Sequence, residues 1–320
     1  MFDSVLVISF GGPQGPKDVK PFLENVLRGR RVAPERMEEV AHHYQMFGGI
    51  SPITRFTQQQ ADGLRVRLAA AGHPLPVYVG MRNWEPFIGD TLREMHAAGA
   101  RRAIGFIAAA HHSYSSCQQY RENVIAARDG LQRDTDGGDI DVTYVDSWFD
   151  HPLFAAANAA HVREAREKLS PEVRGAARLV FTAHSIPTRM ADQSRYREQL
   201  LESGRLVAEQ AGMADWALVF QSRSGRPEDP WLAPDVSEYL RAERAAGLQA
   251  AVLCPIGFVC DHIEVLYDLD HEAAGVCREI GLPMTRAAAV NDDPLFLDMM
   301  ADMVLRTLRR RVLPIAIPPV

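Results

Sequence analysis

Cysteine is scarce in this chain of 320 residues, which contains only Cys117, Cys254, Cys260 and Cys277. Four cysteines are too few for the disulfide framework of a small secreted scaffold. No two of them form a Cys-x-x-Cys pair, which argues against a structural zinc site of the knuckle or ribbon type. We therefore expect reduced and mostly buried thiols in a cytosolic protein.

A surplus of positive charge and long apolar runs are also lacking. The chain has 35 Lys and Arg against 41 Asp and Glu, so its formal net charge is 35 − 41 = −6. Such a mildly acidic chain lacks the basic footprint of a nucleic-acid-binding protein. The longest uncharged apolar stretch, residues 248–260, falls short of the roughly 20 residues of a membrane-spanning helix, and no secretory signal is visible. We expect a soluble, cytoplasmic protein without nucleic-acid partners.

Short apolar runs alternate with amphipathic segments along the whole chain. The expected strands are residues 5–10, 76–80, 102–108 and 140–145, followed by 177–181, 217–220 and 250–253. The expected helices are residues 17–27, 34–46, 58–71, 86–98, 118–127, 152–168, 193–210, 234–246 and 293–310. Apolar strands alternating with helices are typical of parallel sheets covered on both faces. The sequence therefore predicts an α/β protein with two Rossmann-like units, each built on a four-stranded parallel sheet.

The boundary between the two units is expected near residues 147–152, just before a new helix begins. We predict an N-terminal domain at residues 1–147 and a C-terminal domain at residues 148–286. A terminal helix within residues 287–320 should pack back on the first domain. Because ligands bind at the carboxyl ends of strands in such sheets, the loops that follow strands are the candidate sites.

The glycine-rich loop at residues 9–16 follows the first expected strand and invites comparison with a dinucleotide-binding fingerprint. The spacing G-x-G-x-x-G cannot be fitted to it, and Pro13 and Pro16 remove N–H donors that would hold a phosphate. A nucleotide-dependent oxidoreductase therefore remains only a fold-level alternative. We interpret the loop as a turn that a flat or bulky ligand can approach closely.

Two further loops that follow expected strands carry polar side chains. Residues 110–120 are rich in hydroxyl and aromatic groups, which suit a carboxylate or amide ligand but equally suit a polar helix N-terminus. His184 lies just past the strand at 177–181. A histidine there can accept a proton near neutral pH, although a lone histidine is more often structural. Both loops are therefore candidate parts of a ligand site.

Three acidic residues are regularly spaced in the segment after the last expected strand, where a helix should start near Asp261. Glu264, Asp268 and Glu272 stand at i, i+4 and i+8, which on a helix forms a row about 12 Å long. Like charges at this spacing repel, so the row costs stability unless it faces water or serves protons or a cation. A solvated acidic face is the alternative to a functional row.

Six motifs, in order along nearly the whole chain, resemble those of the ferrochelatase family, the metal-inserting enzymes of haem synthesis. They are SFGGP at 9–13, FGGISP at 47–52, TAHSIP at 182–187, QSRSG at 221–225, PWLAP at 230–234 and PIGFVCDHIEVLYDLD at 255–270. The details look most like actinobacterial members, which act on coproporphyrin rather than protoporphyrin. The resemblance implies a class II chelatase-like fold with a porphyrin cleft between two Rossmann-like domains.

The resemblance also implies roles for individual residues. It makes His184 and Glu264 the catalytic pair and the iron site, and it continues the metal-binding row through Asp268 and Glu272. Inserting Fe²⁺ requires removal of two pyrrole protons, and an imidazole with a carboxylate holds Fe²⁺ less tightly than thiolates would. The sequence does not say which residue takes the protons and which binds iron first.

Three porphyrin-binding positions follow from the same resemblance: Phe10, Ser51 and Tyr120. Phe10 stands where some relatives have a tyrosine that ligates product iron, so stacking or shape is the role expected here. Some actinobacterial relatives hold an iron–sulfur cluster with cysteines near the C-terminus, but the last cysteine here is Cys277. We therefore expect no cluster and no required cofactor, with Fe²⁺ as a substrate.

The expected partners are coproporphyrin III and Fe²⁺, and a transient contact with the next enzyme of haem synthesis stays open. We expect a monomer. Three other functions compete: a protoporphyrin IX ferrochelatase, a non-catalytic haem or porphyrin carrier, and a chelatase for another metal such as cobalt. A carrier would not need the two proton acceptors His184 and Glu264. His111 and His112 keep the other-metal chelatase open.

Overall fold

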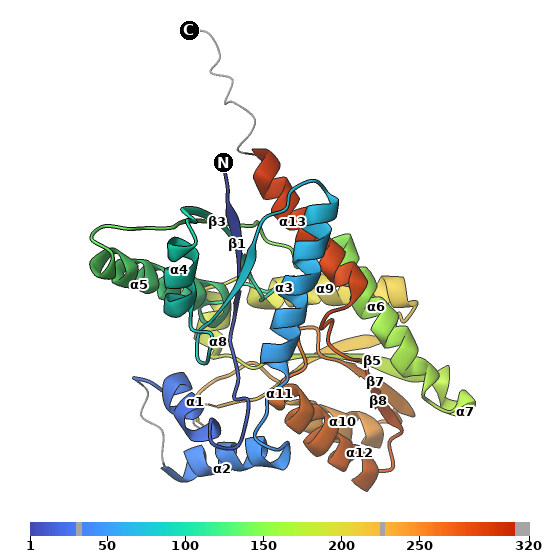
Figure 1. The fold of residues 1–320 in the computed structure, drawn as a ribbon. Helices are drawn as coiled ribbons and strands as arrows, with labels where there is room; N and C mark the ends of the chain where they lie inside the picture. The colour runs from blue at the N-terminus through green and yellow to red at the C-terminus, as the bar shows by residue number, and fades with distance from the viewer. Residues whose placement is uncertain (30–33, 225–227, 311–320) are drawn as a thin grey trace.

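The computed structural model describes residues 1–29, 34–224 and 228–310. These residues form two four-stranded parallel sheets flanked by helices (Figure 1). The first sheet has the order β2 (Val77–Met81), β1 (Ser4–Ser9), β3 (Arg102–Ile107), β4 (Asp141–Tyr144). The second has the order β6 (Trp216–Gln221), β5 (Ala177–His184), β7 (Ala250–Cys254), β8 (Met284–Arg286). Both halves thus repeat one topology, which confirms the predicted pair of Rossmann-like units.

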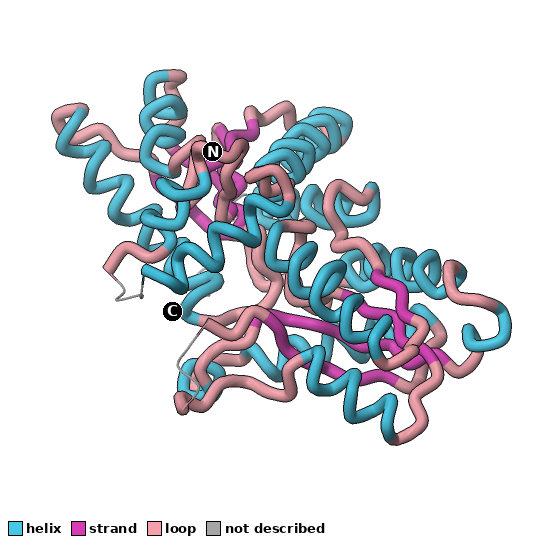
Figure 2. The backbone as a smooth tube through the Cα atoms, turned by 90° about the horizontal axis from the view of Figure 1, so that it is seen from below, coloured by secondary structure: helices cyan, strands magenta, loops and turns pink. Residues whose placement is uncertain are grey.

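The helices connect successive strands and cover the sheets. In the first half they are α1 (Val19–Val26), α2 (Pro34–Met46), α3 (Ile53–Ala70), α4 (Ile88–Ala97), the π-helix η1 (Tyr114–Gln118) and α5 (Gln119–Asp134). In the second half they are α6 (Pro152–Glu167), α7 (Pro171–Arg174), α8 (Thr188–Asp192), α9 (Tyr196–Ala211), α10 (Val236–Ala245), α11 (Ile263–Val265), the π-helix η2 (Leu266–Ala273), α12 (Ala274–Glu279) and α13 (Pro294–Arg310). Figure 2 shows the two sheets as separate groups of strands, each with helices around it. Across the described ranges, no helix has the length and apolar character needed to cross a bilayer.

The inner strands β1 and β7 are buried along their whole length, as the continuous apolar runs predicted. All six residues of β1 are buried, and Val5 pairs with Val77 on one side and Ile104 on the other. In the second half β7 is likewise fully buried. Burial on both faces explains why these strands carry apolar side chains without alternation.

One apolar core joins the two halves. It includes Phe106 of β3, Phe181 of β5 and Phe296 of α13, all fully buried. Trp148, at the expected boundary, stacks on Phe106 with ring centroids 5.5 Å apart and packs edge-on against Phe154 at 5.3 Å. The boundary is therefore a packed seam rather than an open linker.

The last helix, α13, packs against α3 of the first half and also against α6 (Figure 1). Gly63 of α3 lets the two helices approach, because a Cβ there would lie 2.5 Å from the Leu297 side chain. The predicted domain limits at residues 147 and 286 stay predictions. Residues 311–320 of the predicted terminal segment lie outside the described residues.

Several elements differ from the sequence-based expectation, and three of them bear on the site and its sheet. β5 runs through His184, because strand pairing with β6 continues as far as the pair His184 and Gln221. β8 was not among the expected strands, since its three residues are only half-buried. The helix expected from Asp261 begins instead at Ile263, with His262 as its N-cap, and continues as the π-helix η2.

Candidate active site

His184 is the last residue of β5, at the carboxyl edge of the second sheet. Its Nδ1 lies 2.5 Å from the Ser185 carbonyl oxygen, which can only accept, so Nδ1 carries the proton. Nε2 is then left with its lone pair. The Tyr196 hydroxyl donates to the His184 carbonyl oxygen at 3.0 Å and fixes the end of the strand. The local structure therefore sets both the orientation and the tautomer of the ring.

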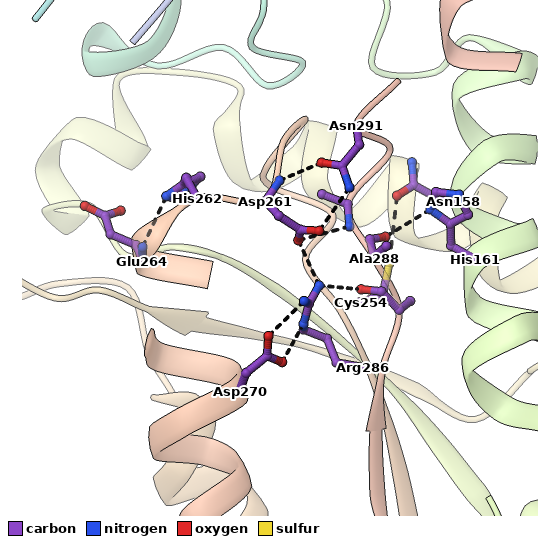
Figure 3. A network of polar contacts seen from close by, with 12 residues as sticks. Asn158, His161, Cys254, Asp261, His262, Glu264, Asp270, Arg286, Ala288 and Asn291 are labelled. Carbon is purple, nitrogen blue, oxygen red and sulfur yellow. Dashed lines mark hydrogen bonds and ion pairs between the residues drawn. The ribbon is translucent and has the colours of Figure 1, made fainter. Parts of the chain in front are cut away.

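Glu264 faces His184 from the first turn of α11. His262 accepts a hydrogen bond from the Glu264 amide through its Nδ1 at 3.3 Å, which caps the helix start (Figure 3). Glu264 Oε2 lies 3.7 Å from His184 Nε2, beyond hydrogen-bonding distance. A divalent ion about 2.1 Å from each atom would bridge this 3.7 Å separation at a bend. The pair can thus accept a cation or a proton between its members.

Asp268 lies on η2 beside the end of β6. The Gln221 side-chain amide donates to Asp268 Oδ2 at 3.2 Å and to the Glu264 carbonyl oxygen at 3.1 Å. The Ser222 hydroxyl also donates to Asp268 Oδ2. Burial raises the pKa of Asp268 to about 7, and the neighbouring Glu264 and Glu272 carboxylates add to the rise. This carboxyl group can therefore exchange a proton near neutral pH.

Glu272 lies at the outer, exposed end of the acidic row. Loss of hydration raises its pKa, with a further contribution from Asp235. The row Glu264, Asp268, Glu272 runs over a helix that is π in its second part, whereas the spacing alone predicted a plain helix. The solvated-face alternative does not describe Asp268, which is half-buried and accepts two side-chain hydrogen bonds.

Helix α2 contacts the segment 261–272, which carries the acidic row and is called the acidic segment below. The sequence analysis did not predict these contacts. Tyr44 is buried, and its pKa is raised by burial and by the Glu264 and Asp268 carboxylates beside it. His43 stacks on Tyr267 of η2 with ring centroids 3.6 Å apart. The only sequence signal was the position of α2 just before the FGGISP motif. The acidic segment is thus covered by the first half of the chain.

The three predicted porphyrin residues gather around the loop that follows β1. Ser51 is 3% exposed, and its amide donates to the Pro13 carbonyl oxygen at 2.8 Å. Phe10 packs in one apolar cluster with the buried Tyr120. Phe10 also packs with Ile263, the neighbour of Glu264, in a second cluster around Phe22. Apolar packing thus links the loop after β1 to the start of the acidic segment.

His111 and His112 were the residues that left a chelatase for another metal as an alternative function. Both form hydrogen bonds with residues of the second half of the chain. His111 is buried, its Nε2 lies 3.0 Å from the Ser203 hydroxyl of α9, and burial lowers its pKa to about 3. The His112 amide donates to the Gln199 side chain at 2.7 Å. The buried His111 ring is thus already engaged through Nε2 by the second half of the chain. Within the described ranges, no three His, Cys, Asp or Glu side chains converge on a metal-sized site.

Sequence comparison gives a consistent result along the chain. The family profile described as Ferrochelatase matches residues 3–308. The chain is 48% identical over 304 residues to the protein named Ferrochelatase from Rhodopirellula baltica, covering 95% of this chain and 85% of that one. It is 44% identical over 306 residues to the Coproporphyrin III ferrochelatase of Mycolicibacterium smegmatis, with 95% and 89% covered. For the protein of that name from Streptomyces coelicolor, identity is 45% over 322 residues, with 95% and 85% covered.

Solved structures agree at the level of the fold. The structure described as SirB from Bacillus subtilis with Fe³⁺ superposes with a TM-score of 0.59 at 10% identity, covering 98% of each chain. The sirohydrochlorin chelatase SirB from Bacillus subtilis subspecies spizizenii gives 0.57 at 10% identity and 97% coverage of each. These likenesses confirm the predicted chelatase-like fold. The profile match and the relatives at 44–48% identity show that the chain belongs to the ferrochelatase family.

Proposed function

We propose that this chain inserts Fe²⁺ into coproporphyrin III, forms coproheme in haem biosynthesis, and releases two protons. The observation that carries the proposal is the facing pair of His184 Nε2 and Glu264 Oε2, 3.7 Å apart, in a chain of the ferrochelatase family. The choice of coproporphyrin is supported by the names of the relatives from Mycolicibacterium smegmatis and Streptomyces coelicolor.

The residues divide the chemistry between proton and metal. His184 Nε2 has its lone pair available because Nδ1 donates to Ser185, so it can accept a pyrrole proton. Glu264 opposite it can hold the ion or take the second proton. Asp268, with a pKa of about 7, can pass protons on at neutral pH, and Glu272 connects the row to water. The row can equally carry cations inward, since its charge is negative.

Weak metal binding is part of the proposal. A neutral imidazole and a carboxylate are acceptable ligands for Fe²⁺, but they bind it less tightly than thiolates do. In the part of the chain that the structure describes, no third metal-binding side chain joins the pair closely. The ion can therefore leave for the porphyrin nitrogens.

The macrocycle would lie against Phe10, Ser51 and Tyr120. Phe10 has no phenol, so it cannot ligate product iron, and a stacking or shaping role is the one proposed. We further propose a monomeric, cytoplasmic enzyme without a resident cofactor. The proposal on cofactors follows the distribution of cysteines, the last of which within the 320 residues is Cys277.

The test is an anaerobic assay with purified protein, Fe²⁺ and metal-free coproporphyrin III, followed by visible absorption. We expect the free-base bands to give way to those of the iron complex, faster than with protoporphyrin IX. His184→Ala and Glu264→Gln should each lower the rate by roughly 10²–10⁴-fold, the usual effect of losing a positioned acid–base group. Persistent free-base bands with the wild-type protein would support a carrier and contradict the proposal.

Two variants serve as matched controls. His73→Ala removes an exposed histidine in the loop after α3, and Glu94→Gln neutralises an exposed glutamate of α4. Both lie outside the residues described above, so they should retain the wild-type rate. If the insertion rate of a control falls as far as that of His184→Ala or Glu264→Gln, the loss reflects general damage to the protein rather than the chemistry of His184 and Glu264.

A further inference from the structure

Arg286, the last residue of β8, binds two carboxylates that flank Glu264 and Asp268 in the sequence (Figure 3). Its Nε and Nη2 donate to the two oxygens of Asp270 at 2.6 and 2.8 Å. Its Nη1 donates to Asp261 Oδ1 at 2.8 Å. One guanidinium therefore fastens both sides of the segment 261–270. Its side chain is only 14% exposed, so water screens these bonds little.

Asp261 is itself fixed on the side away from Arg286. Asn291 donates through its side-chain amide to Asp261 Oδ2 at 2.9 Å and accepts from the Asp261 backbone amide at 2.8 Å (Figure 3). The Asn291 carbonyl oxygen accepts from the buried Gln60 of α3 at 2.7 Å. Arg286 thus ties the acidic segment to a point that is anchored in the first half of the chain.

The acidic segment needs such an external tie. Glu264, Asp268 and Glu272 repel one another along it, and π-helices are rare in proteins, where they occur mostly at functional sites. Glu264, in the turn α11 that leads directly into η2, must nevertheless stay 3.7 Å from His184. A relaxation of η2 to ordinary α-helical bonding would move Asp268 away from Gln221 and Ser222 at the end of β6.

We propose that Arg286 is a positioning residue for iron insertion, which holds the segment 261–270 so that Glu264 faces His184 and Asp268 stays beside Gln221 at the end of β6. The proposal rests on the iron-inserting function proposed above. Arg286 touches neither Glu264 nor His184 among the contacts of the described chain, and it acts through Asp261 and Asp270.

Arginine is suited to this role and lysine is not. The planar fork of the guanidinium satisfies both oxygens of Asp270 while a third N–H reaches Asp261, whereas an ammonium group is a single point donor. Arg286→Lys therefore keeps the charge and removes the geometry. Losing an outer support of a metal ligand typically costs 10- to 100-fold in metal affinity or activity.

The first measurement is amide hydrogen exchange of the metal-free protein, which does not depend on activity. In Arg286→Lys we expect faster exchange in residues 261–273, with β1 and β5 unchanged. Unchanged exchange in residues 261–273 would overturn the proposal. Hydrogen exchange tests the role of Arg286 even if the wild-type protein inserts no iron. Failure of the wild-type protein to insert iron would contradict the proposed function but not the role of Arg286.

The second measurement is the rate of insertion with Fe²⁺ varied at saturating coproporphyrin III, and the reverse. Arg286→Lys should lower kcat/KM for Fe²⁺ by about 10- to 100-fold and leave the KM for porphyrin near the wild-type value. A purely structural role would lower the amount of active enzyme without separating the two KM values. Equal effects on both substrates would therefore overturn the proposal.

The matched control is Arg178→Lys. Arg178 lies at the opposite end of β5 from His184 and likewise joins two carboxylates, Asp215 and Glu243, with a side chain 25% exposed. It should show comparable thermal destabilisation without the effect on Fe²⁺. If Arg286→Lys does not fold, Asp270→Asn removes one side of the tie at a residue whose side chain is 38% exposed. A wild-type kcat/KM for Fe²⁺ in Asp270→Asn would count against the proposal.

Discussion

Among single residues, Asp268 couples ionisation most clearly to stability. Burial raises its pKa to about 7, well above the ordinary value of an aspartate. The folded protein therefore binds more protons at this group than the unfolded chain does between about pH 4 and pH 7. The free energy of unfolding should fall as the pH rises through this window, because ionisation is easier in the unfolded state.

Asp268→Asn removes that ionisation and keeps an oxygen that accepts from Ser222 and Gln221. In the metal-free protein, we expect the variant to be more stable than the wild type at pH 8 by at least about 1 kcal/mol, and similar to it at pH 4.5. Urea unfolding at both pH values measures the difference. Asp129→Asn, at an exposed position of α5, is the control and should show no such dependence. An equal difference in the free energy of unfolding between Asp268→Asn and the wild type at both pH values would contradict the raised pKa of Asp268.

The same variant separates stability from function. If Asp268 passes protons or cations during insertion, Asp268→Asn gains stability at pH 8 and loses activity. A gain in stability without a loss of activity would remove Asp268 from the proposed route. Such opposite effects are common where a strained or repelling group is kept for function.

The candidate residues were predictable from sequence, but their contacts were not. His184 and Glu264 stood in recognisable motifs, and the fold brings them to 3.7 Å from each other. Gln221 was visible only as part of a motif, because its bond to Asp268 depends on how β6 is placed against η2. Tyr44 gave no signal, since its burial against the acidic segment is a matter of packing between the halves.

At the scale of elements, apolar runs predicted the buried strands well. The expected strand at 102–108 corresponds to β3 at Arg102–Ile107, and the helix at 34–46 matches α2. The helix expected at 58–71 begins earlier, at Ile53. A spacing of four residues fits both α-helical and π-helical turns, so the winding of η2 could not be read from Glu264, Asp268 and Glu272.

The loop after β7 makes a close crossing over β5 that a single methyl group should disrupt. A Cβ at Gly257 would lie 2.6 Å from the Ala183 Cβ and 2.7 Å from its Cα, and this backbone cannot yield. Gly257→Ala should therefore push the loop away from the strand end that carries His184. We expect a loss of about 1–3 kcal/mol in the free energy of unfolding, together with slower iron insertion.

Urea unfolding and the iron-insertion rate measure both effects. The control is Gly175→Ala, after α7, where no heavy atom lies within 4 Å of the added methyl group and the backbone φ is −69°. It should change the free energy of unfolding by no more than about 0.5 kcal/mol. If Gly257→Ala is as stable and as active as this control, the close crossing does not hold the loop in place.

At the scale of the whole molecule, the two repeated sheets do not form independent bodies. The main core cluster contains residues of β1, β3, β5, β7 and α13. Polar bonds reinforce it: Gln60 of α3 reaches Asn291, and His111 reaches Ser203 of α9. The sequence rhythm predicted two units, but it could not predict this shared packing, because the residues involved are far apart in the chain.

A shared core predicts that the two sheets unfold together. Pulsed hydrogen exchange across a urea titration gives separate midpoints for peptides of β1 and β7, and these midpoints should coincide. Phe296→Ala tests the coupling, because Phe296 is fully buried in α13 and packs on Trp148 with ring centroids 5.8 Å apart. The cavity should cost about 3–5 kcal/mol and lower both midpoints by the same amount. If the midpoint of one sheet shifts while that of the other stays, each half is stabilised by its own core, and the packing at the seam does not couple them.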